Sequence, residues 1–82
     1  MNKESLREIM NGILKRKGLP EAAADTEELR AVGFRSLDFS EMALRVEKDA
    51  GRELNFDAAL MRSIRTVGDV LSFFEHATKQ DA

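Results

Sequence analysis

Three separate segments carry apolar residues at the spacing of one helix face, and this pattern constrains the fold more than any other feature. The stripe of the first segment consists of Leu6, Ile9, Met10, Ile13 and Leu14. In the second segment, which starts near Ser36, the residues on one side are Phe39, Met42, Ala43, Val46 and Ala50. The third stripe consists of Val67, Val70, Leu71 and Phe74. The spacing predicts three amphipathic helices whose apolar faces pack against one another.

Residues that cap helices stand at the expected ends of these segments. Asn2 or Ser5 can cap the first helix, and Gly18 supplies a stop after it. Gly51 ends the second helix, while residues 66–69, Thr-Val-Gly-Asp, have the spacing of a capping box for the last one. The helix limits are therefore predicted by local chemistry as well as by the period of the stripes.

The remaining parts of the chain have weaker patterns. Residues 19–33 form a long connection in which Leu29 and Val32 are expected to anchor the loop to the core. Within it, residues 25–26 could start a short turn of helix, and residues 54–64 indicate a short irregular helix. No internal repeat, low-complexity stretch or strong strand alternation is present.

Together these patterns predict an all-α fold, a small four-helix bundle with three main helices, a short third helix and a long first loop. The 82 residues suffice for one domain, which we assign to residues 1–82 with a frayed tail at 78–82. No apolar run reaches the ~18 residues that a membrane-spanning helix needs, and the first residues lead into no apolar signal region. We therefore expect a cytoplasmic protein without membrane insertion, and we also expect a monomer.

Charge and cysteine content argue against several classes of function. The formal net charge is −2, whereas nucleic-acid binders usually need a basic face, so no nucleic-acid partner is expected. The chain has no cysteine, which excludes disulfides and thiolate metal sites, and any thioester chemistry needs an added thiol. His76 is the single histidine, and nothing in the sequence brings it to Ser36, so we expect neither a catalytic triad nor a metal site.

The segment from Gly33 to Asp38, Gly-Phe-Arg-Ser-Leu-Asp, carries the most informative motif of the chain. It resembles the signature of the acyl and peptidyl carrier proteins, Gly-hydrophobic-Asp-Ser-Leu at the start of the second helix. Leu29 and Val32 precede it as the family's loop anchors do. Residues 64–70, Ile-Arg-Thr-Val-Gly-Asp-Val, resemble the start of the family's final helix. The resemblance covers nearly the whole chain.

This resemblance implies a 4′-phosphopantetheine group attached covalently to the Ser36 hydroxyl. The thiol at the end of this group would carry acyl or related intermediates as thioesters. It implies a non-enzymatic carrier in lipid, surface-lipid or lipopolysaccharide, or secondary-metabolite biosynthesis. The implied partners are a phosphopantetheinyl transferase and acyl-loading and acyl-transfer enzymes. A helix N-terminus suits the phosphate of such an arm, because its free backbone N–H groups and its dipole attract anions.

Arg35 stands where the family normally has an aspartate that helps the transferase engage the site. This departure indicates a specialised carrier with a dedicated transferase or partner rather than the housekeeping carrier of fatty-acid synthesis. Two alternatives stay open. Ser36 could serve only as a helix N-cap, since serine is a preferred cap. The chain could also be a protein–protein interaction module that keeps the carrier fold without the arm.

The outer face of the second helix is the predicted docking surface for partner enzymes. Leu37 and Leu44 point away from the predicted core, one above the other, although helices often expose an apolar residue and the loop could also cover them. Between residues 37 and 57 acidic side chains outnumber basic ones, so this segment is net acidic. The predicted docking residues are Arg35, Leu37, Asp38, Glu41, Leu44, Arg45 and Lys48.

Overall fold

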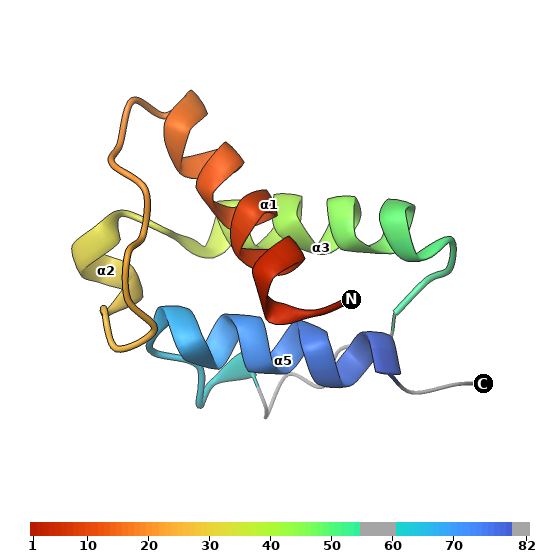
Figure 1. Cartoon of the computed structure of the whole chain (residues 1–82). Helices are drawn as coiled ribbons and strands as arrows, with labels where there is room; N and C mark the ends of the chain where they lie inside the picture. Colours follow the sequence, from red (N-terminus) through yellow and green to blue (C-terminus); the bar gives the residue numbers. More distant parts are fainter. Residues whose placement is uncertain (55–60, 80–82) are drawn as a thin grey trace.

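The computed structural model describes residues 1–54 and 61–79, and it confirms the predicted small all-α bundle (Figure 1). The helices of this described part are α1 (Lys3–Arg16), α2 (Leu29–Val32), α3 (Ser36–Ala50) and α5 (Val67–Lys79). No strand forms in these two ranges, where the only extended pairing is an isolated bridge between Glu28 and Thr66. None of the helices described is long and apolar enough to cross a membrane.

The core lies between the three long helices. Figure 1 shows α1 crossing over α3 and α5, which run in the same direction, and all three pairs of helices are in contact. The predicted stripes face this centre: among the fully buried side chains are Leu6, Met10, Ile13, Leu14, Met42, Val46, Val67, Val70, Leu71 and Phe74. Phe39 and Phe74 stack with ring centroids 5.1 Å apart, which joins α3 to α5. The helical periods therefore predicted the core correctly.

The helix ends follow the predicted capping chemistry. The Ser5 backbone N–H donates to Asn2 Oδ1 at 2.8 Å, so Asn2, and not Ser5, caps α1. Gly51 ends α3 in the left-handed conformation with φ of 74°. At α5 the capping box forms, because the Asp69 N–H donates to Thr66 Oγ1 at 3.1 Å and the Thr66 N–H donates to Asp69 Oδ2 at 3.0 Å.

The first loop is pinned to the core at more points than the sequence indicated. Leu29 and Val32 pack against the core as predicted, and Ala22 and Phe34 are buried there as well. A turn forms at residues 25–26 as expected, but the helix of this loop comes later, at α2.

Backbone hydrogen bonds tie the same loop to the start of α5. The Leu29 N–H donates to the Arg65 carbonyl at 2.9 Å, and the Gly68 N–H donates to the Asp25 carbonyl at 2.8 Å. A Cβ at position 68 would lie 3.0 Å from Asp25 Cβ, so the glycine permits this close approach. The loop is thus held as a fixed part of the fold, and it places the segment that precedes α3.

Two predictions concern the ends of the described ranges. The tail was expected to fray from residue 78, but α5 continues through Lys79, and Thr78 Oγ1 accepts a hydrogen bond from the N-terminal ammonium at 3.0 Å. The predicted short irregular helix at 54–64 falls largely on residues 55–60, which lie outside the described residues. At its edges, Leu54 is buried and Ile64 packs against the core.

Candidate functional site

Ser36 is the first residue of α3, and its side chain is exposed. Arg35, with extended backbone (φ −110°, ψ 179°), occupies the N-cap position. The interpretation of Ser36 as an N-cap is therefore wrong by one position, because the residue already lies within the helix. No side chain or backbone group of the described chain forms a hydrogen bond with the Ser36 hydroxyl. The hydroxyl is thus presented to solvent at a helix N-terminus.

Gly33 sets the path of the chain into this site. It ends α2 with φ of 84°, a conformation that residues with a side chain rarely adopt. A Cβ at this position would lie 2.6 Å from Leu19 Cδ1, so the Leu19 side chain would have to shift to admit one. The Phe34 N–H then donates to the Leu29 carbonyl at 2.9 Å, and the Phe34 ring is buried. The hydrogen bond from Phe34 to Leu29 and the burial of the Phe34 ring hold the backbone immediately before Ser36.

Lys17, just after α1, contacts the chain on both sides of Ser36, at Gly33 and at Asp38. Its ammonium donates to the Gly33 carbonyl at 2.7 Å and lies 2.6 Å from Asp38 Oδ2. The same carboxylate oxygen accepts the Arg35 backbone N–H at 2.8 Å. One cation therefore ties α1 to the chain on both sides of Ser36.

Asp38 was predicted to belong to the docking surface, and this prediction is wrong. The sequence pattern placed it on the outer face of α3, but its residue is only 8% exposed. Burial raises the pKa of Asp38, but the hydrogen bonds from the Lys17 ammonium and the Arg35 N–H outweigh burial, and the pKa is held below its usual value. The carboxylate thus binds the Lys17 ammonium and the Arg35 N–H inside the protein and is not accessible to a partner.

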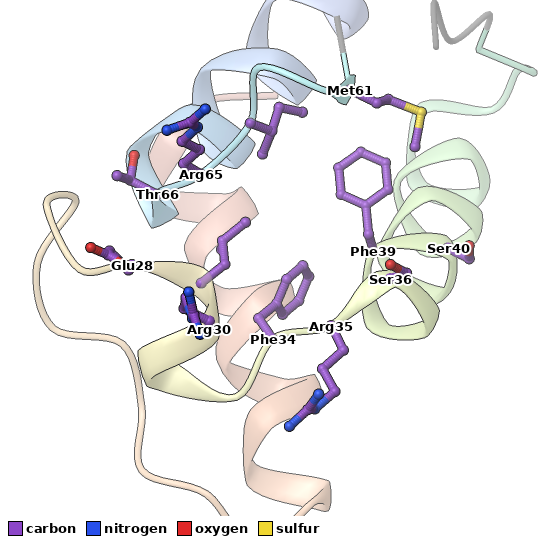
Figure 2. Close-up of a pocket in the computed structure, with 12 residues that line it drawn as sticks. Glu28, Arg30, Phe34, Arg35, Ser36, Phe39, Ser40, Met61, Arg65 and Thr66 are labelled. Atoms are coloured by element: carbon purple, nitrogen blue, oxygen red, sulfur yellow. The ribbon is translucent and has the colours of Figure 1, made fainter. Parts of the chain in front are cut away.

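A cleft of about 970 Å³ opens beside Ser36, between the start of α3, the α2 region and residues 61–66 (Figure 2). Its apolar lining consists of Leu29, Phe34, Phe39, Met61 and Ile64. In Figure 2 the Phe39 ring points from α3 toward Met61, and Ser36 lies at the edge of the same space. The cleft therefore offers an apolar surface next to the exposed hydroxyl.

Cations line the rim of this cleft. Arg30 and Arg65 belong to the lining, and neither has an ion pair within the described ranges. The Arg35 side chain, by contrast, extends away from the Ser36 hydroxyl (Figure 2). The lining thus contains three arginines, Arg30, Arg35 and Arg65, and one acidic residue, Glu28, whereas the chain as a whole has a net charge of −2.

The outer face of α3 carries the two leucines that were predicted to point outward. Leu37 is 84% exposed and Leu44 is 68% exposed, which confirms their orientation and shows that the first loop does not cover them. Glu41, between them, is half-buried and pairs with both Arg16 and Arg45. Lys48 is exposed.

The residue that the sequence analysis missed is Lys17. It was one of three consecutive basic residues at the end of a predicted helix, and such residues ordinarily complement the helix dipole. Its partner Asp38 lies 21 positions away. No local pattern relates the two residues, and only the packing of α1 against α3 brings them together.

A scan against protein-family models found no match to this chain. Neither a search of curated proteins nor a search of solved structures found one.

Proposed function

We propose that this chain is an acyl carrier protein that bears a 4′-phosphopantetheine arm on Ser36. The observation that carries the proposal is the Ser36 hydroxyl at the first position of α3, which is exposed, forms no hydrogen bond within residues 1–54 and 61–79, and lies beside an apolar cleft. A serine with only a capping role would donate or accept within the helix end. This one leaves its oxygen available for modification.

The residues around Ser36 fit such an arm. The first turn of α3 offers backbone N–H groups without helical partners and the positive end of the helix dipole, which together favour a phosphate. Arg35 directly precedes Ser36 and forms no ion pair within residues 1–54 and 61–79, so its exposed guanidinium can reorient toward a phosphodiester. The arm supplies the thiol that this cysteine-free chain lacks.

The rest of the site also supports a carrier. Lys17 and Gly33 hold the proposed attachment segment, residues 33–38, in place. The cleft, lined by Phe34, Phe39 and Ile64 among others, offers an apolar surface to an intermediate attached nearby. In this proposal the protein catalyses no reaction itself. It presents intermediates to acyl-loading and acyl-transfer enzymes in the cytoplasm. These enzymes belong to lipid, surface-lipid or secondary-metabolite biosynthesis.

Arg35 favours a second candidate, a carrier-like interaction module without the arm. It places a positive charge where the carrier family has an aspartate that the transferase uses. The exposed leucines Leu37 and Leu44 would serve such a module equally well. The two candidates differ in one observable, the covalent state of Ser36.

Intact-mass spectrometry separates them. Wild type, Ser36→Ala and Ser40→Ala are each incubated with coenzyme A and a broad-specificity phosphopantetheinyl transferase. Ser40 is a matched control, because it is exposed, lies on the same helix and lines the same cleft. We expect one added phosphopantetheine on wild type and on Ser40→Ala, and none on Ser36→Ala. A wild type that stays unmodified with every transferase tried, including one encoded beside its gene, would support the module instead.

A further inference from the structure

The acidic residues predicted to meet a partner are engaged within the protein itself. Asp38 is buried against Lys17, and Glu41 lies between the guanidinium groups of Arg16 and Arg45. Both carboxylates are therefore neutralised by cations from α1 or from their own helix. The net acidic count of residues 37–57 therefore does not give the charge next to Leu37 and Leu44 on α3.

What remains exposed on this face is apolar and basic. We define the docking ridge as Leu37, Leu44 and Lys48 on the outer side of α3, together with Arg35 at its N-cap. Leu37, Leu44 and Lys48 lie within about 40° of one another around the helix axis, since positions seven and eleven residues apart nearly coincide. Neither Arg35 nor Lys48 has an ion pair within residues 1–54 and 61–79. Asp49, an exposed acid of α3 with no ion pair in the described part of the chain, lies about 120° from Leu37, on the flank of the helix.

We propose that the docking ridge binds partner proteins whose contact surface is an apolar socket with an acidic rim. The inference rests on the proposed carrier function, because it assigns the charge of the partners that approach Ser36. Leu37 and Leu44 supply two exposed apolar anchors, and Arg35 and Lys48 flank them at either end. Around the ridge, Arg16, Arg35, Arg45 and Lys48 carry four positive charges against the two negative charges of Glu41 and Glu47, the latter about 80° from Leu37 around the helix axis. A complementary acidic rim gives orientation and speeds association.

A protein surface explains the ridge better than an anionic membrane does. The ridge has only two large apolar side chains, one above the other, whereas a membrane-surface helix exposes a broad apolar face. The chain also has a net charge of −2, which repels an anionic bilayer. A narrow apolar ridge with a cation at each end matches a socket on a folded partner.

Nuclear magnetic resonance titration of the ¹⁵N-labelled full chain tests the proposal with two defined probes. Both are amphipathic helical peptides with the same apolar stripe, flanked by glutamates in one and by lysines in the other. We expect the glutamate peptide to bind about fivefold or more tightly than the lysine peptide, since each of two exposed charge contacts contributes modestly. The shifted amides should lie at residues 35–48, and added salt should reduce the difference.

Variants assign the effect to the ridge. The double variant Arg35→Glu with Lys48→Glu should reverse the preference between the peptides. Its matched control is Lys3→Glu with Lys79→Glu, the same change of charge at exposed lysines of α1 and α5, and it should keep the wild-type preference. Leu44→Ala should weaken binding of both peptides without changing their order.

Three outcomes would overturn the proposal: equal or tighter binding of the lysine peptide, shifts that map outside residues 35–48, or a control double variant that behaves like the ridge variant. Sedimentation with phosphatidylglycerol vesicles adds a fourth, because binding that the ridge charge reversal abolishes would assign the ridge to a lipid surface. The mass of each sample after transferase treatment is measured separately. An unmodified Ser36 with intact ridge selectivity would therefore refute the carrier and leave the ridge, while a modified Ser36 without selectivity would do the reverse.

Discussion

The inner face of α3 is buried and its outer face is exposed, although apolar side chains occur on both. On the inner face, Met42 and Val46 are fully buried against α1 and α5. On the outer face, Leu37 and Leu44 are 84% and 68% exposed. Burial of a large apolar side chain stabilises a fold by about 1.5–3 kcal/mol, which the outer leucines do not contribute in the isolated chain. The inner face therefore maintains the fold, and the outer face is available for a partner.

The two faces differ in their charges as well. The inner face needs none, whereas on the outer face Asp38 and Glu41 are paired within the protein and Arg35 and Lys48 have no ion pair among the described residues. Counts of acidic and basic residues along a helix therefore do not give the charge of its exposed surface. Each of the following predictions tests one part of this difference, in order of the expected effect.

The largest difference should separate Met42→Ala from Leu44→Ala. Removing a fully buried side chain leaves a cavity, so Met42→Ala should lower the free energy of unfolding by about 2–5 kcal/mol. Leu44→Ala removes an exposed side chain and should change it by less than about 0.5 kcal/mol. Urea denaturation followed by circular dichroism measures both. Similar losses in the two variants would place Leu44 in the core and remove the docking ridge.

Asp38→Ala tests the boundary between the two faces. The variant leaves the Arg35 N–H without its acceptor and Lys17 without its ion pair, so we expect the free energy of unfolding to fall by about 1–2 kcal/mol. Asp49→Ala is the matched control, because Asp49 is an exposed acid of the same helix, and its effect should stay near zero. Equal effects in the same urea experiment would show that Asp38 belongs to the outer surface after all.

The pH dependence of stability should show the same internal role. Folding lowers the pKa of both Asp38 and Asp69, so the unfolded chain binds more protons than the folded chain as the pH falls toward these groups. Their contribution is fully present above the unfolded value of about 4 and is lost as the pH falls through the lower folded values. Thermal unfolding from pH ~7 down to ~2 should therefore show a decline that starts near pH ~4.

Asp38→Asn should make that decline shallower, because the amide cannot titrate. Asp69→Asn should do the same at the start of α5, where the Arg65 and Thr66 N–H groups hold the pKa of the carboxyl down. Curves that run parallel to wild type throughout would show that neither group contributes to the acid transition.

The last prediction concerns Arg35→Asp, a change at an exposed side chain that forms no ion pair within residues 1–54 and 61–79, although its charge acts on Asp38. Because Arg35 is the N-cap of α3 and aspartate is a preferred cap, we expect the free energy of unfolding to rise by up to about 1 kcal/mol. Modification of Ser36 by a transferase from fatty-acid synthesis should become faster, because the variant restores the acidic neighbour that the carrier family has. Lys48→Asp, the same charge change three turns away, should leave that rate unchanged. Equal rates for wild type and Arg35→Asp would make Arg35 a neutral departure from the family pattern.

Periodicity and capping chemistry in the sequence alone determined the long helices, their buried stripes and the outward direction of Leu37 and Leu44. These features are local: a side chain's angle around its own helix follows from the residue number, and the caps at Asn2 and Thr66 act within one turn. The exposed position of Ser36 at the start of α3 follows from the same reasoning, apart from the one-residue shift of the cap to Arg35.

Only the tertiary structure decided the fate of Asp38 and Glu41, the burial of Ala22 and Phe34, and the cleft beside Ser36. Each depends on a segment distant in sequence that approaches from outside the helix, as Lys17 does from α1. The period of a helix states which way a side chain points, but it contains no information about which neighbour arrives there. Packing therefore decides whether a charged residue on the flank of a helix is buried or exposed. The Lys17 ammonium, within 3 Å of Asp38, makes this carboxylate an internal ion-pair partner rather than part of the surface.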